Sequence, residues 1–259
     1  MKQCYHCTIS WTIVCVVLWG IITDRSSAQT GSTTSIAVMN FENNSVVDRE
    51  KLDPLKKGLA DMLITEMSEI NGLKVIERRQ IQSVADELNI TDLDVVDKST
   101  SQKLGRLLGA KVLLFGGFSN LFGDKLRIDT RVVSTETGIT LKAEEETGAL
   151  AEFSSLMNAL VRDVARDLEI RLSTADEMRL NIAANRKFDG YVTYAQGVNM
   201  EDSASALSKI GNQSDALAMY ENARAIYQKA FTELSGYQPA KQRADEMGQI
   251  ILQMKKESK

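Results

Sequence analysis

The feature that most constrains the fold is an unbroken apolar run near the middle of the chain, Val112 to Phe115. A strand without polar alternation is typical of the centre of a sheet that is covered on both faces. Apolar and polar residues then alternate over Leu126 to Val132, and a returning strand over Ile139 to Thr147 completes an antiparallel meander. Apolar residues recur at helical spacing over Leu150 to Leu172, which predicts a helix that closes the sheet.

A second apolar stretch, Ser35 to Phe41, predicts the first strand. We expect a polar loop over Glu42 to Leu52. Asp53, which stands before a proline, is expected to cap the next helix. A short strand over Leu73 to Ile76 follows that helix. A strand–helix–strand unit of this kind predicts parallel pairing with a right-handed crossover.

Two helices are predicted between this unit and the central strand. The first covers Arg78 to Leu88, and the second begins at a cap, Ser99 or Thr100, and stops at Gly109. The sequence therefore predicts an α/β fold, with a mixed sheet of about five strands and flanking helices, followed by a small all-α domain.

Residues 174–259 contain helical patterns and no strand signals. Small and large residues recur there at the spacing of one tetratricopeptide repeat: Leu207, Ile210, Gly211, Ala223, Tyr227 and Ala230. Because a single repeat cannot form a solenoid, a generic helical hairpin is an equally good interpretation. We expect three segments, 1–28, 29–173 and 174–259, and take Tyr220 and Tyr227 as candidate protein contacts.

The N-terminal segment predicts export. Lys2 precedes a short apolar run, Ile9 to Ile22, and Ser26-Ser27-Ala28 offers small residues for cleavage, which is typical of a signal peptide. The run is shorter than the roughly 20 residues of a membrane span, although a retained anchor is an alternative interpretation. Cleavage would remove every Cys, His and Trp of the chain: Cys4, His6, Cys7, Trp11, Cys15 and Trp19.

The remaining composition excludes several kinds of chemistry. Without Cys and His the exported chain can form no disulfide, no thiolate nucleophile and no zinc site of the usual kind. The acidic net charge, −4 for the whole chain, argues against nucleic acid as a partner. Strand alternation should send Glu145 to one face and Glu144 and Glu146 to the other, so the three carboxylates do not converge and no catalytic pair is predicted. We therefore expect no cofactor, no metal and no enzymatic activity.

The meander carries charges that suggest a contact surface. Arg127 and Arg131 lie on one face of the first strand, and Glu144 and Glu146 lie on one face of the next. If these faces coincide, Arg127 lies near Glu146 across the pair. A solvated sheet face with ion pairs and a docking face for a neighbouring subunit are both open interpretations. At the strand-to-helix junction, Glu77-Arg78 is interpreted either as a local structural pair or as a partner-contacting rim.

Several short motifs resemble the CsgG/HfaB family of curli secretion and envelope-assembly proteins, over roughly residues 33–172. They are Val38 to Phe41 with Asn44-Ser45, Gly72 to Arg78, and Leu108 to Lys111 with Gly116-Gly117. The family's secretion pore has a lipidated N-terminal cysteine and two long membrane-inserted hairpins. Here the cysteine is missing, Ser119 to Lys125 is a tight turn, and Ala149 runs directly into a helix. The resemblance thus implies the globular periplasmic part of that fold.

The function expected from these features is a non-enzymatic periplasmic binding or scaffold module in envelope or curli-type assembly. The alternative is a subunit of a CsgG-type outer-membrane secretion channel. The expected partners are other envelope proteins or a second copy of the chain, with no nucleic acid and with peripheral outer-membrane association as an option.

Overall fold

A computed structural model describes residues 33–257, except 91–92, 94–96, 121–122 and 182–185. The predicted signal peptide therefore lies outside the described residues. Residues 33–259 form one compact unit by their internal contacts. The three segment boundaries predicted above stay a prediction.

The unit contains a five-stranded mixed sheet in the order β2-β1-β3-β4-β5. Its strands are β1 (Thr34–Asn43), β2 (Leu73–Val75), β3 (Val112–Ser119), β4 (Lys125–Ser134) and β5 (Thr140–Ala149). Strand β1 pairs in parallel with β2 and β3, whereas β3, β4 and β5 pair antiparallel. The predicted fold class, the parallel β1–β2 unit and the central position of the strand containing Val112 to Phe115 are confirmed.

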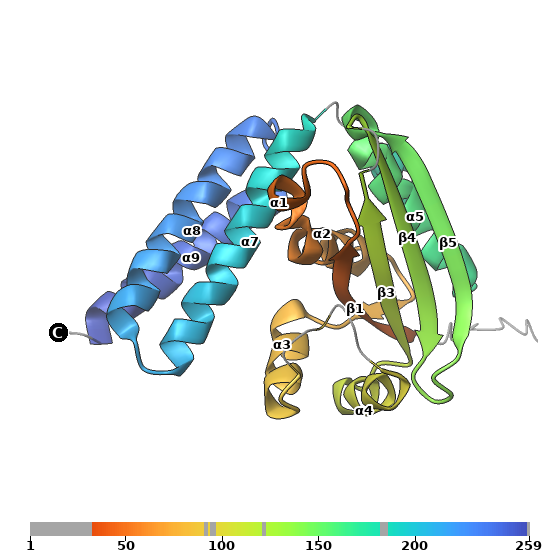
Figure 1. Cartoon of the computed structure of the whole chain (residues 1–259), viewed down its shortest axis with the longest axis horizontal. Helices are drawn as coiled ribbons and strands as arrows, with labels where there is room; N and C mark the ends of the chain where they lie inside the picture. The colour runs from red at the N-terminus through yellow and green to blue at the C-terminus, as the bar shows by residue number, and fades with distance from the viewer. Residues whose placement is uncertain (1–32, 91–92, 94–96, 121–122, 182–185, 258–259) are drawn as a thin grey trace, which may run out of the picture. The chain divides into compact units, whose positions relative to one another are not determined.

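Helices flank the sheet and continue beyond it (Figure 1). Those of the α/β part are α1 (Arg49–Leu52), α2 (Leu55–Ser68), α3 (Arg78–Glu87), α4 (Lys98–Leu108) and α5 (Phe153–Asp167), which follows a short 3-10 turn, η1 (Leu150–Glu152). The C-terminal helices are α6 (Thr174–Asn181), α7 (Phe188–Lys209), α8 (Gln213–Glu233) and α9 (Gln238–Glu257). Helix α5 packs on β4 and β5, while α7 packs on both α2 and α8.

Two predicted helix starts were wrong. Helix α1 forms the last four residues of the predicted loop between Glu42 and Leu52, and Asp53, which follows it, has right-handed helical dihedral angles. The N-cap of α2 is Pro54 instead of Asp53. Helix α4 is capped by Asp97, whose carboxylate accepts hydrogen bonds from the backbone N–H groups of Ser99 and Thr100. Both hydroxyl residues thus lie inside the first turn, where their hydroxyls also donate to Asp97.

Close contacts at two glycines explain how the layers meet. A Cβ atom on Gly116 of β3 would lie 2.2 Å from Cε1 of Phe41, so the ring of Phe41 packs directly on the strand backbone. A Cβ atom on Gly58 of α2 would lie 2.2 Å from Cβ of Ala195 on α7. The missing side chain at Gly58 therefore lets α2 and α7 approach closely, and this contact joins the sheet-bearing part to the C-terminal helices.

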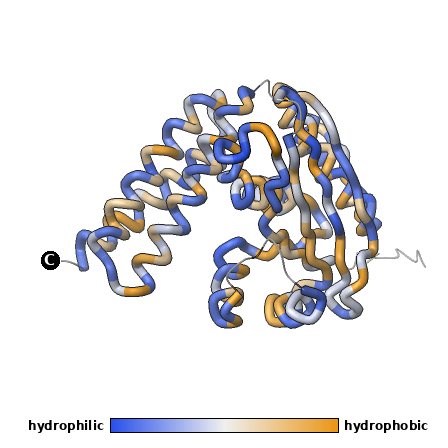
Figure 2. The backbone as a smooth tube through the Cα atoms, viewed as in Figure 1, coloured by the Kyte–Doolittle hydropathy of each residue, from blue (hydrophilic) through white to orange (hydrophobic). Residues whose placement is uncertain are grey.

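The C-terminal helices contain the tyrosines of the repeat-like stretch. Ala223, Tyr227 and Ala230 are fully buried in the antiparallel α7–α8 pair, whereas Ile210 is 78% exposed at the end of α7. Hydrophilic and hydrophobic residues alternate along these helices (Figure 2). Both the single-repeat and the helical-hairpin interpretation describe this arrangement.

Candidate functional site

An ion-pair network lies where α2 meets α7 and α9. Asp61 of α2 is fully buried, and Arg243 of α9 donates to its Oδ1 atom. The Tyr194 hydroxyl donates to Oδ2 of Asp61 over 2.7 Å. An aspartate within the fully buried stretch of α2 therefore has two partners from the C-terminal helices, as a buried charge requires.

A second buried carboxylate, Glu201 of α7, continues the network. It accepts a hydrogen bond from the Tyr227 hydroxyl at 2.8 Å and ion pairs from Arg79 at 3.0 Å and Arg243 at 3.4 Å. Burial alone would lower the pKa of Arg243, but Asp61 and Glu201 outweigh it and the pKa is raised. Burial also raises the pKa values of Tyr194 and Tyr227. The arginine thus stays charged and both hydroxyls stay protonated donors.

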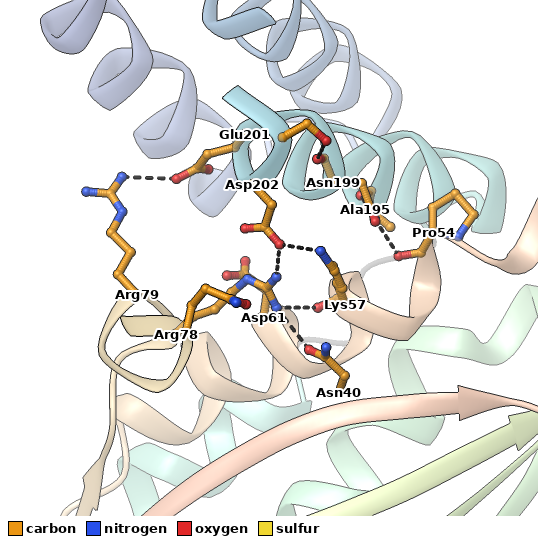
Figure 3. A network of polar contacts seen from close by, with 12 residues as sticks. Asn40, Pro54, Lys57, Asp61, Arg78, Arg79, Ala195, Asn199, Glu201 and Asp202 are labelled. Atoms are coloured by element: carbon orange, nitrogen blue, oxygen red, sulfur yellow. Dashed lines mark hydrogen bonds and ion pairs between the residues drawn. The ribbon is translucent and has the colours of Figure 1, made fainter. Parts of the chain in front are cut away.

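A third carboxylate, Asp202, connects α7 to the start of α3 (Figure 3). Its Oδ2 atom binds both Arg78 and Lys57, the latter over 2.8 Å. Arg78 also donates to the side chain of Asn40 on β1. The structural interpretation of Arg78 as a local pair was wrong, because its partner is 124 residues away in sequence.

These ion pairs form the floor of a groove between α3 and α7, which we call the α3–α7 groove. Its volume is about 650 Å³. The α3 wall is polar, with Arg79, Gln82, Ser83 and Asp86. The facing wall is mixed, with the apolar or aromatic Val198, Ala206, Ile210, Tyr220 and Ile250 and the polar Ser203, Ser205 and Lys209. Lys209 and Asp86 form an ion pair of 2.6 Å that links α7 to α3.

The two predicted tyrosine contacts have different positions. Tyr220 lines the α3–α7 groove and is 7% exposed. Tyr227 is fully buried and its hydroxyl is bound to Glu201, so its side chain is not available at the surface.

The predicted charged face of the meander is divided between the two sides of the sheet. Arg127 lies opposite Thr147 and pairs with Glu145 at 3.0 Å, and also with Asp129 on its own strand, so the predicted proximity to Glu146 was wrong. Arg131 lies on the same exposed face. A difference of one residue in register moves a side chain to the other face of a strand. The observed pairing differs by one residue from a pairing of Arg127 with Glu146, so the two side chains lie on opposite faces of the sheet.

Glu144 and Glu146 instead face α5. Glu144 pairs with Arg166 at 3.0 Å, and Glu146 lies beside Asp163. Burial, followed by a hydrogen bond with Asp163, raises the pKa of Glu146. These carboxyl groups thus form an α5–β5 contact, and a role of Arg127, Arg131, Glu144 and Glu146 in protein binding stays a prediction.

Sequence reasoning missed the central members of the network, Asp61 and Arg243. The signal for Asp61 was present, since residues 58–64 of α2 are buried throughout and Asp61 is the only charged residue among them. Arg243 gave no such signal because α9 carries charges on several sides. In the described part of the chain no three His, Cys, Asp or Glu side chains could hold a metal ion.

Comparison with known proteins relates part of the chain to one family. The family model described as curli production assembly/transport component CsgG matches residues 22–123. This match contains all the motifs on which the sequence resemblance rests, but not residues 124–172. No curated protein matches the chain.

Several solved structures are similar over about half of the chain. The LpoB C-terminal domain from Escherichia coli has 13% identity and a TM-score of 0.35, covering 45% of this chain and 83% of that domain. Lipoprotein GNA1162 from Neisseria meningitidis has 19% identity and a TM-score of 0.36, covering 52% and 98%. The PelC dodecamer from Paraburkholderia phytofirmans has 12% identity and a TM-score of 0.30, covering 54% and 90%.

Proposed function

We propose that this chain is an exported, non-enzymatic binding module of the bacterial cell envelope. It assists the assembly of an envelope structure by holding a segment of another protein in the α3–α7 groove. The observation that carries the proposal is the mixed lining of this groove, in which α3 gives charged and polar side chains and the apolar and aromatic side chains come from α7, α8 and α9. Such a lining suits an amphipathic segment of a partner protein.

The charges of the groove indicate which segment fits. Glu201 has three donors, so Arg79, which is 61% exposed, can turn toward a partner while Tyr227 and Arg243 still satisfy Glu201. Arg79 is therefore the cation that can receive a carboxylate from outside. An apolar side chain further along the segment would cover Ile210, which is 78% exposed at the rim. Because Ile210 follows Glu201, the partner of Arg79, by nine residues along α7, the expected segment carries an acidic and an apolar residue about 13 Å apart.

The location in the envelope rests on the sequence. The signal-peptide pattern of residues 1–28 predicts export, and the family model that matches residues 22–123 is that of a curli assembly and transport component. Within the described ranges no helix has the length and apolar composition needed to cross a bilayer.

The absence of enzymatic activity is part of the proposal. The carboxylates at the floor of the groove, Asp61, Glu201 and Asp202, are each bound by at least two donors from other elements. Carboxylates held in this way suit a structural role, whereas a general base must be able to reach a substrate proton.

Site-specific photo-crosslinking in cells tests the proposal. A photoreactive amino acid is placed at Ser83, an exposed α3 residue that lines the groove. The matched control position is Gln80, an exposed residue of the same helix outside the groove. We expect an adduct with one defined envelope protein from position 83 in the periplasmic fraction, and little or none from position 80.

Three outcomes would contradict the proposal. Equal adducts from both positions would show that the groove is not the contact surface, and recovery of the chain only from the cytoplasmic fraction would exclude export. Turnover of a defined substrate by the pure protein would exclude the non-enzymatic role.

A further inference from the structure

A second cavity lies between α2, α5, α7 and the start of α9. Its volume is about 410 Å³, and it shares no lining residue with the α3–α7 groove. Apolar and aromatic side chains, including Met62, Met157, Tyr191 and Tyr237, form part of its wall. This size and lining are typical of sites for small organic ligands.

The polar groups of this cavity leave one hydroxyl without a partner. Tyr237 is only 4% exposed, yet among the described residues none forms a hydrogen bond with its hydroxyl. Burial raises its pKa, so the hydroxyl keeps its proton and remains a donor. The hydroxyl oxygen is not one of the fully enclosed polar atoms that lack a partner, so water can reach it, and an acceptor brought by a ligand can replace that water.

One guanidinium of the cavity also has unused donors. Arg186 lies over the Tyr237 ring, 5.0 Å from its centroid, and its Nε atom donates to the Leu234 carbonyl oxygen. Within the part of the chain that the structure describes, its two Nη groups have no hydrogen-bond partner. They can therefore bind an oxygen anion that also reaches the Tyr237 hydroxyl.

The charged side chains that line the cavity show which guanidinium is left for a ligand. The second arginine, Arg179, is neutralised by Glu66, which it binds at 2.8 Å through the side chain and at 3.1 Å through the carbonyl oxygen. Glu69, which is exposed, also lines the cavity, so two carboxylates and two guanidinium groups balance in charge. The case for a bound carboxylate therefore rests on the Nη groups of Arg186, to which no described residue is hydrogen-bonded, and on the Tyr237 hydroxyl.

We propose that this cavity binds the carboxylate of an apolar acid, with Arg186 and Tyr237 holding the carboxylate and the methionine and tyrosine side chains holding the apolar body. The carboxylate belongs either to a free small molecule or to the C-terminus of a peptide. This site is independent of the proposed function, because no groove residue takes part in it.

Calorimetric titration of the purified protein at neutral pH tests this proposal. The small-molecule probe is hydrocinnamate, with hydrocinnamyl alcohol as the uncharged match. The peptide probe is acetyl-Ala-Ala-Phe with a free C-terminus, with the C-terminal amide as its match. We expect saturable binding of at least one acid, at least about tenfold tighter than its uncharged match, since a hydrogen bond to a charged group is lost.

Variants locate the binding. Arg186→Gln should weaken binding of the acid by about tenfold or more, and Arg171→Gln, at an exposed arginine outside the cavity, should leave it unchanged. Tyr237→Phe removes only the hydroxyl and should weaken binding by about threefold to tenfold, which keeps the test valid if the Arg186 variant does not fold.

Binding of hydrocinnamate points to a free acid as the ligand, and binding of the peptide acid alone points to a C-terminus. The proposal is overturned if no acid binds, if the uncharged matches bind as tightly, or if neither cavity variant weakens binding.

Discussion

Replacing Arg243 with methionine should destabilise the whole of residues 33–257. Arg243 is the cation shared by two buried carboxylates, Asp61 and Glu201, whose side chains are 0% and 10% exposed. Removing one partner of a buried pair leaves an uncompensated charge and costs about 3–5 kcal/mol. The side chain of Arg243 is itself only 18% exposed, so solvent screening does not reduce this figure greatly. Urea unfolding, followed by circular dichroism, measures the free energy of unfolding.

The matched control is Arg224→Met on α8, an exposed arginine, which should change the free energy of unfolding by less than about 0.5 kcal/mol. The double variant Arg243→Met with Asp61→Asn should lose less than the two single losses combined, because the charge left unpaired by the first change is removed by the second. A loss below about 1 kcal/mol for Arg243→Met, or additive losses in the double variant, would refute the reasoning.

Three further predictions follow from packing, hydrogen bonding and titration. Gly58→Ala should lower the free energy of unfolding by about 1–3 kcal/mol, because its Cβ would lie 2.2 Å from Ala195. In the same urea assay the control Gly248→Ala, whose Cβ would have its nearest neighbour at 3.5 Å, should be neutral or stabilising. Tyr194→Phe should cost about 1–3 kcal/mol because a buried carboxylate loses a donor, and an unchanged urea midpoint would contradict this. The pKa of Glu146 is raised from 4.5 in the folded state, so its contribution to stability falls as pH rises above that value. The stability of Glu146→Gln relative to wild type should therefore increase with pH. A decrease would contradict the sign of this argument.

The sheet could be predicted because its hydrophobic pattern is strong. Val112 to Phe115 is apolar on both faces, and β4 alternates between buried and exposed residues along its length. These patterns depend on local sequence, so they specify strand type and order well. The short helix α1 left no comparable pattern, since four residues make barely one turn.

The candidate site could be predicted only in part, because it depends on contacts between distant residues. Asp61 and Arg243 are 182 residues apart in sequence, and no spacing rule joins them. The predicted position of Glu146 depended on strand register, which hydrophobic alternation leaves open on a charged strand such as β5. Tyr227 was taken as a contact although an aromatic residue at helical spacing fits a helix core equally well, and it lies there.

The yield of the crosslink from position 83 in an Ile210→Glu background tests the central claim most directly. Ile210 is 78% exposed, so this substitution should leave the fold intact, while it places a charge where the partner's apolar side chain should lie. We expect the adduct seen in the wild-type background to be lost, with unchanged protein level and urea midpoint. An undiminished adduct would contradict binding in the α3–α7 groove.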